Sequence, residues 1–413
     1  IKANSTHFGG LSSLLVSFDA RRFGSVTDAG WLVTGELKWD RGFLNGLENG
    51  QIGNLLGLDG EGLGDRSDPT GKELWDAESM AAYNTTHPLH GDILVSFERQ
   101  HRVWRYKFGS EGHRAIPSHV SGLSGEDSKI SVCPHNGGAE AMEILRDGRI
   151  MVLCEESILE QVAEPVSEGE GSVVTEVLGW VVGSDGLMQE LRYLIRDGLS
   201  PVALARIPAS DDLLLLERKW TPEEGTTIRV RHVTERALLL SLVGGCVISA
   251  GLVAELNAKL HQVDNFEGLA IIPGFPRHRR PIPPGAGTRR SEGEDELVEE
   301  SDSERLEVLM VSDDNFADTQ RTLLFSFHVN RTVLPGASCL ARPTPDWAIG
   351  GVAILVAVPA LSVCVCFVMA VVAKRAEKTG RMQWLVNIFR GEQRFEIIDN
   401  ARPRQQEGTE LAA

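Results

Sequence analysis

The chain has 413 residues, of which 42% are hydrophobic and 24% are charged, a composition typical of a globular protein that can bury a sizeable core. Its formal net charge of −17 argues against a nucleic-acid-binding protein, because such a protein would carry a basic surface. The sequence has no G-x-S-x-G, H-E-x-x-H or G-x-x-x-x-G-K-[ST] motif, which excludes the hydrolases and NTPases that depend on them.

Residues 1–330 contain many short hydrophobic runs and few amphipathic helical stretches. The runs are LLVSF, ILVSFE, RIMVLCEE, DLLLLERKW, TIRVRHV, EVLMVSDD and TLLFSFHV. They are rich in Val, Leu, Ile and Phe and are separated by Gly, Asp and Asn, a pattern typical of β-strands and turns. This region is therefore predicted to be an all-β domain.

A short acidic unit recurs ahead of these runs. Its copies cover residues 76–80, 138–142 and 265–269, with Glu78, Glu140 and Glu267 at the centre, and residues 8–11 resemble a fourth copy without the acid. The runs that follow end in acids, namely Asp28, Glu98, Glu155 and the pair Asp313 and Asp314, and Glu217 supplies a further ending. A repeat of this kind indicates one structural unit used several times.

This repeat predicts a β-propeller, in which equivalent loops of all blades converge on one end of a central channel. At ~50 residues per blade, six blades are expected. Repeated carboxylates would then form a ring that repels itself unless cations or protons intervene, and Ca²⁺ with its oxygen ligands suits such a ring. The alternative is that these acids cap turns and pair with arginines such as Arg99 and Arg218.

Three segments interrupt the β pattern. Residues 155–172 form a short acidic insert, and residues 276–305 begin as PRHRRPIPPGAGTRR and then turn acidic, which predicts a disordered surface loop. Residues 237–254 are uncharged but short, contain three glycines and lack a basic flank. We therefore expect one or two buried strands with a Gly-rich turn there, in preference to a membrane span.

A transmembrane helix is predicted at residues 347–373. From Ala348 to Ala373 there are 26 residues without a charge, more than the ~20 that a spanning helix needs. Trp347 precedes them, and the basic cluster Lys374, Arg375, Lys378 and Arg381 follows them. The positive-inside rule places the polar tail, residues 374–413, in the cytoplasm and residues 1–330 in the extracellular or lumenal space, joined by a stalk at 331–346.

Glycosylation sequons and cysteines agree with this orientation. The sequons begin at Asn4, Asn84 and Asn330, all on the expected outside, and are predicted glycosylation sites. Four cysteines lie in the same region, and Cys133 and Cys154 are close enough in sequence to pair, although the sequence leaves the connectivity open. The alternative to a span is a buried C-terminal helix, against which the basic cluster argues.

Several long stretches resemble the phytase-like domain family, also described as esterase-like activity of phytase. They are FGGLSSL, TDAGWL, ILVSFERQHRVWRY, NGGAEAMEILRDGRIMVLCEE, LLLLERKWTPEEGTTIRVRHV, DNFEGLAI and VSDDNFADTQRTLLF, and together they span residues 8–328. The family's recurrent acids match Asp28, Glu78, Glu98, Glu140, Glu155, Glu217, Glu267, Asp313 and Asp314. The chain departs from the family at Ser79, where Gly is usual, and in the long insert before the last strand.

The resemblance implies a Ca²⁺-dependent phosphoester hydrolase acting on a small phosphorylated substrate, with those nine acids as metal ligands. Glu140, Glu267 and Asp313 are the expected catalytic carboxylates, one of them as general base. Arg99, Arg218 and Lys219 could clamp the phosphate or could equally pair with the acids. Two alternatives remain open: a propeller lactonase or arylesterase, and a non-catalytic propeller that serves as a binding module or receptor.

Overall fold

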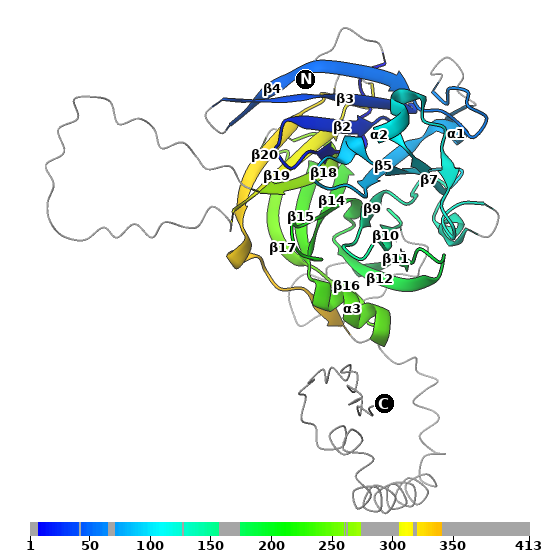
Figure 1. The fold of residues 1–413 in the computed structure, drawn as a ribbon. Helices are drawn as coiled ribbons and strands as arrows, with labels where there is room; N and C mark the ends of the chain where they lie inside the picture. The colour runs from blue at the N-terminus through cyan, green and yellow to red at the C-terminus, as the bar shows by residue number, and fades with distance from the viewer. Residues whose placement is uncertain are drawn as a thin grey trace, which may run out of the picture. The chain divides into compact units, whose positions relative to one another are not determined.

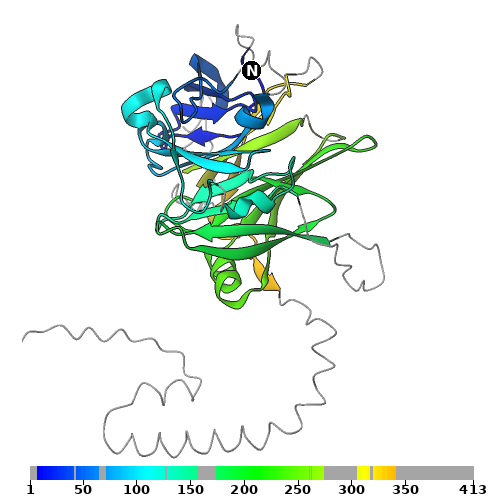
Figure 2. The ribbon, with the colours of Figure 1, turned by 90° about the vertical axis from the view of Figure 1, so that its right-hand side faces the viewer.

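The strands that the structure describes form five sheets, which are the blades of a β-propeller (Figures 1 and 2). The computed structural model describes residues 7–40, 43–64, 71–125, 128–156, 174–259, 261, 263–273, 305–316 and 320–340. The first blade contains β1 (Leu15–Val16), β2 (Arg22–Val26), β3 (Trp31–Asp40) and β4 (Phe43–Asn54), and the second contains β5 (Ala77–Ala82), β6 (Ile93–Phe97), β7 (Arg102–Tyr106) and β8 (Ser118–His119).

The third blade is the widest. It contains β9 (Ala141–Ile144), β10 (Ile150–Leu153), β11 (Val174–Val182) and β12 (Met188–Arg196), and β16 (Val247–Ser249) and β21 (Ser338–Leu340) extend its outer edge. The fourth blade contains β13 (Ser200–Arg206), β14 (Leu213–Thr221), β15 (Gly225–Val233) and β17 (Gly251–Asn257), and the fifth contains β18 (Asn265–Pro273), β19 (Arg305–Asp313) and β20 (Leu324–Asn330). The helices are α1 (Lys72–Trp75), α2 (Phe108–Glu111) and α3 (Glu235–Gly244), with short 3-10 turns between strands.

The innermost strands β1, β5, β9, β13 and β18 close the ring. Each contacts the next in this order, and β18 also contacts β1. One hydrophobic core lies between each pair of neighbouring blades: for example, Val26 and Leu32 of the first blade pack against Val95 of the second. Central strands such as β6 are buried along their whole length, because a neighbouring blade covers each face. This burial explains why the sequence shows continuous hydrophobic runs.

The all-β propeller prediction is confirmed, but the number of blades is five, so the prediction of six was wrong. The estimate of ~50 residues per blade failed because several segments add no blade. Helix α3, β16 and β21 enlarge the third blade, and the two inserts expected at 155–172 and 276–305 fall almost entirely outside the described residues.

The segment 237–254 differs from its predicted form. Strands β16 and β17 are present, but the first part is helix α3. Thr234 caps this helix, because its Oγ1 accepts a hydrogen bond from Ala237 N (3.2 Å), and Gly245 ends it with a φ of +65°. The run ALLLSLVG carries no clear period, so the sequence pattern alone did not separate helix from strand.

Two disulfides join the described cysteines, Cys133 with Cys154 and Cys246 with Cys339. The second bond fixes β21 in the region expected to be a stalk, so part of that segment is folded. Among the described residues, no helix has the length and apolar character of a membrane span. The predicted span, the cytoplasmic tail, Asn4 and the 276–305 insert, apart from Arg305, lie outside the described residues.

Candidate active site

In every blade, the start of the innermost strand lies beside the end of the second strand. Glu98 N donates a hydrogen bond to Asp76 O (2.8 Å), and Glu155 N donates one to Gly138 O (2.8 Å). The corresponding pairs in the other blades are Gly10 with Asp28, Ser200 with Arg218 and Asn265 with Asp313. We call the second member of each pair the ring position. It is occupied by Asp28, Glu98, Glu155, Arg218 and Asp313, one residue from each blade.

In three of the five blades, a glutamate lies two residues after the first member of the pair. These glutamates are Glu78, Glu140 and Glu267, and the other two blades have Ser12 and Val202 at this place. Glu78 and Glu267 lie at irregularities of strand pairing, between Ala77 and Ser79 and between Phe266 and Gly268. A bulge of this kind adds a residue to one strand and redirects its side chain. The acidic unit of the sequence therefore marks the places where the innermost strand directs a carboxylate toward the channel.

The acids of both positions line one cavity of about 380 Å³ at this end of the channel. Seven of the nine predicted metal-binding acids are among its walls: Asp28, Glu78, Glu98, Glu140, Glu155, Glu267 and Asp313. All three predicted catalytic residues are in this set. The cavity is also lined by Lys72, Asn136, Arg218, Trp220, Thr226, Asn265, Asn315 and Gln320.

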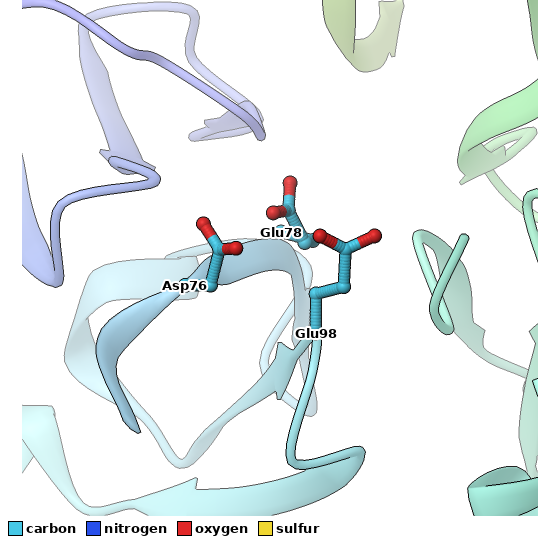
Figure 3. A group of neighbouring side chains, drawn as sticks. All are labelled: Asp76, Glu78 and Glu98. Carbon is cyan, nitrogen blue, oxygen red and sulfur yellow. The ribbon is translucent and has the colours of Figure 1, made fainter. Parts of the chain in front are cut away.

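Among the described residues, two groups of carboxylates are close enough to share a cation. One consists of Asp76, Glu78 and Glu98, which Figure 3 shows gathered at one end of the β5–β6 pair, and the other consists of Glu98, Glu140 and Glu155. In each group, one oxygen per residue lies within 4.8 Å of the others. Two oxygens bound to one Ca²⁺ at 2.3–2.6 Å can be ~5 Å apart at most, so both groups fit this hard cation. Glu98 belongs to both groups.

The electrostatics of the cavity oppose full ionisation. Burial, followed by the neighbouring Asp76 carboxylate, raises the pKa of Glu98 to about 7, and burial is also the main cause that raises the pKa of Asp313 to about 6. Burial and nearby acids also place the pKa values of Glu78, Glu140 and Glu267 well above the ordinary value for Glu. A bound divalent cation would remove this penalty and release protons.

Arg218 is the one cation at the ring position. Its guanidinium contacts Glu267 Oε1 through Nη1 (2.9 Å) and Glu155 Oε1 through Nη2 (3.1 Å), and Nη1 also donates to Asn265 Oδ1. Asn265 in turn donates to Glu267 Oε1 (2.8 Å) and Asp313 Oδ2 (3.3 Å). One part of the ring therefore carries its own counter-ion, which reaches the Glu98–Glu140–Glu155 group through Glu155, whereas Arg218 contacts no member of the Asp76–Glu78–Glu98 group.

A family model described as "Phytase-like: Esterase-like activity of phytase" matches residues 6–316. The chain belongs to the phytase-like family. No curated protein matches the sequence. Among solved structures, a thermostable family-43 glycoside hydrolase matches with a TM-score of 0.39 and 8% identity, over 82% of this chain and 96% of that chain. The pyranose dehydrogenase PQQ domain from Coprinopsis cinerea matches with a TM-score of 0.32 and 7% identity, over 76% and 81%.

Two predicted acids of the phytase-like domain lie outside the cavity. Glu217 is fully buried, where its carboxylate accepts hydrogen bonds from Tyr193 Oη (2.6 Å) and Arg231 Nε (2.7 Å). It precedes Arg218 by one residue, and neighbouring side chains of a strand point to opposite sides, so Arg218 takes the ring position instead. Asp314 accepts hydrogen bonds from Gly10 N (2.9 Å) and Thr322 Oγ1 (2.8 Å), which ties the N-terminal loop to the fifth blade.

The three predicted phosphate-binding residues have different surroundings. Arg218 lines the cavity but is held by its carboxylates. Arg99 is outside the cavity walls and binds Asp76 through Nε (2.6 Å) and Asn136 through Nη2 (2.9 Å). Lys219 donates to the backbone oxygen of Asp197 (2.6 Å), away from the cavity.

Sequence reasoning missed Asp76, Lys72, Asn136, Asn265 and Trp220. Asp76 and Asn265 occupy the same first place in two copies of the acidic unit, so the repeat itself could have identified them. The side chain of Lys72 is 38% exposed and its Nζ lies 3.3 Å from Asp76 Oδ1. It therefore keeps further N–H donors available at the cavity wall, although no sequence motif marks it.

The first place of the unit has no side chain in the first blade, and this absence has a physical reason. Gly10 has a φ of +60°, and a Cβ at this residue would collide with the Asp28 carboxylate. A side chain here would displace the ring acid, so the first blade contributes only Asp28 from this pair of positions.

Of the glycosylation sites, Asn84 is exposed in a turn, where its Oδ1 accepts from Thr86 N (3.2 Å) and His87 N (3.0 Å). Asn330 is half-buried and caps a short 3-10 turn. Glycosylation at both residues remains a prediction.

Proposed function

We propose that this phytase-like domain is a Ca²⁺-dependent hydrolase of phosphoesters that acts at the acid-lined end of its channel. The observation that supports it is the pair of carboxylate groups joined by Glu98, with a lysine and an arginine on the same cavity walls. Asp76, Glu78, Glu98, Glu140 and Glu155 would hold the cations. When bound, Ca²⁺ would neutralise phosphate oxygens and lower the pKa of a coordinated water.

The chain's own residues have separate tasks in this proposal. Asp313, with a pKa of about 6, is ionised at neutral pH and can take a proton from an attacking water. Its carboxylate is oriented by Asn315 N (2.6 Å) and Asn265 Nδ2 (3.3 Å). Lys72 can contact the substrate phosphate, whereas Arg218 positions Glu155 and Glu267. Trp220, which is 66% exposed, provides a flat surface at the cavity wall.

The cavity lining favours a charged substrate over an apolar ester. Trp220 is the only hydrophobic side chain among the described residues that line it, and the others are charged or polar. A lactone or aryl ester would gain little from such walls, because apolar ligands are bound mainly by hydrophobic and aromatic side chains. A phosphoester offers oxygens for cations, lysine and asparagine alike.

The test is an assay of the full chain with p-nitrophenyl phosphate, bis-p-nitrophenyl phosphate and phytate, each with Ca²⁺ and with a chelator. We expect Ca²⁺-dependent turnover that is lost in Glu98→Gln. The matched control is Glu143→Gln, because Glu143 is another carboxylate with a raised pKa, about 7 because of burial, but lies outside this cavity. Bound Ca²⁺ without turnover of any substrate would favour the binding module, and no Ca²⁺ binding at all would refute the proposal.

We further propose that residues 347–373 anchor the domain in a membrane, with the propeller outside the cytoplasm. The two disulfides support this side, because disulfides persist in oxidising compartments. The exposed Asn84 is accessible to glycosylation. Resistance of the chain to carbonate extraction, together with a mobility shift after glycan removal, is the expected result. A soluble, unglycosylated chain would contradict it.

A further inference from the structure

Helix α3 presents an apolar face to solvent. Leu239 and Leu240 are 45% and 47% exposed, and Val243 is 87% exposed, the highest exposure of any large hydrophobic side chain among the described residues. Because residues three and four apart are neighbours on a helix, these three form one patch, which we call the α3 patch. The opposite side of the helix, with Ala237, Leu238 and Ser241, is buried against the third blade.

The α3 patch lies at the rim of the propeller. The strand order β21-β16-β12 places α3 beside the outer edge of the third blade, far from the innermost strands, as Figure 1 shows. Cys246 follows α3 directly and is bonded to Cys339 in β21. The chain therefore leaves the described domain at Leu340 from a place that is covalently held next to α3.

The position of the predicted span restricts what can cover the patch. Only seven residues, 341–347, separate Leu340 from Ala348, where the 26 uncharged residues begin. An extended chain of this length reaches no more than ~28 Å. If the span crosses a bilayer, the end of β21 and the adjacent α3 are held within this distance of the lipid surface. An exposed apolar helix face so close to a bilayer could bury its side chains in the lipid.

We propose that the α3 patch rests on the lipid surface and fixes the orientation of the propeller on the membrane. This inference depends on the proposed membrane span. Leu239, Leu240 and Val243 would enter the boundary between headgroups and acyl chains, as in helices that lie on a membrane. Arg236, exposed one turn before Leu240, has a guanidinium suited to lipid phosphates. Contact at the rim leaves the acid-lined end of the channel open to water.

The test uses the full chain in lipid nanodiscs, after Cys364→Ala and Cys366→Ala remove the two cysteines of the span. A spin label is attached at Val243→Cys, and its collision rates with oxygen, which enters lipid, and with a nickel chelate, which stays in water, are compared. The control label is at Leu187→Cys, because Leu187 is 71% exposed in the hairpin between β11 and β12. We expect the label at residue 243 to shift toward oxygen and the label at 187 to remain in water.

A second variant tests the contact itself. Leu240→Glu should return the label at residue 243 to water, and Leu187→Glu should leave it in lipid. Carbonate extraction of the same chain separates the two hypotheses. An anchored chain whose label at 243 stays in water overturns only the role of α3, whereas an extractable chain overturns the span and this inference together. Shielding from both reagents with broadening between labels would assign the patch to a second copy and overturn the proposal.

Discussion

The acid ring has two sides, one around Arg218 and one around Glu98, and the charges of their buried carboxylates are offset in different ways. Around Arg218, a protein cation neutralises Glu155 and Glu267, and Asn265 connects Glu267 with Asp313. Around Glu98, Asp76 is contacted by Arg99 and Lys72 from outside the ring, but Glu78 and Glu98 remain crowded and their pKa values rise. The comparison teaches that the first side has a protein cation that offsets part of the burial penalty of its acids, although the pKa of Glu267 is still raised, whereas Glu78 and Glu98 depend on a proton or a bound cation.

The largest effect is expected from Arg218→Met, which removes the cation of the first side. Glu155 and Glu267 would lose their counter-ion in a buried site, which should lower the free energy of unfolding by about 3 kcal/mol. Urea unfolding in chelator measures this loss. Lys219→Met is the control, because among the described residues Lys219 donates to a backbone oxygen and forms no ion pair, and its effect should be well below that of Arg218→Met. Equal losses in both variants would contradict the counter-ion role.

Glu98→Gln should instead affect the second side. Because Glu98 belongs to both carboxylate groups, Ca²⁺ affinity should fall at least about a hundredfold, or about 2.7 kcal/mol. Without Ca²⁺ the variant should unfold at the same or a higher urea concentration, since one repelling charge has been removed. Calorimetric Ca²⁺ titration and urea unfolding provide the two readouts. A large loss of stability in chelator would show that Glu98 is structural instead.

The pH dependence of stability should change sign with Ca²⁺. The folded pKa of Glu98, about 7, lies above the ordinary value, so the folded chain binds this proton more tightly than the unfolded chain. In chelator, the contribution of Glu98 to the free energy of unfolding should therefore be greatest below about pH 4.5 and should fall as the pH rises to about 7. With Ca²⁺ the ligands must be deprotonated, so affinity should rise up to about tenfold per pH unit between pH 6 and 7 for each proton released. Stability in chelator that does not depend on pH would contradict this electrostatic account.

The smallest effect on stability is expected from Lys72→Met. The lysine is 38% exposed, and an exposed ion pair contributes less than about 1 kcal/mol. Its loss should raise KM for a phosphoester by about tenfold, the equivalent of one charge-assisted hydrogen bond, with little change in melting temperature. Kinetics of the variant at saturating Ca²⁺ measure this. An unchanged KM would remove Lys72 from the substrate site.

Much of the fold was predictable, because the propeller is built from local hydrophobic runs. The runs ILVSFE and RIMVLCEE contain the strands Ile93–Phe97 and Ile150–Leu153, which are buried along their whole length. The number of blades was not predictable from length, since β16, β21 and α3 enlarge one blade without adding another. Whether residues 237–244 form a helix depended on Thr234 and Gly245, two capping residues beside an apolar run that has no period.

The sequence predicted the site residues that stand in the repeated unit. The prediction was wrong where the register of two paired strands determines which residue reaches the ring position. Glu78, Glu140 and Glu267 stand in the recurring unit, and all line the cavity. Glu217 ends its run as Glu98 does, but the pairing of Ser200 with Arg218 moves the ring position by one residue. Register across two strands is a tertiary property, so the sequence pattern could not distinguish Glu217 from Arg218.

The bond between Cys246 and Cys339 also determines how the domain responds to mechanical force. Tension applied through the C-terminal segment would first reach β21, which is held to β16 by only three residue pairs. The disulfide transfers that tension to the chain beside α3 before it reaches β20, the outer strand of the fifth blade. The 93-residue covalent loop that it closes contains the whole fifth blade, so pulling on the chain end would not peel that blade from the ring.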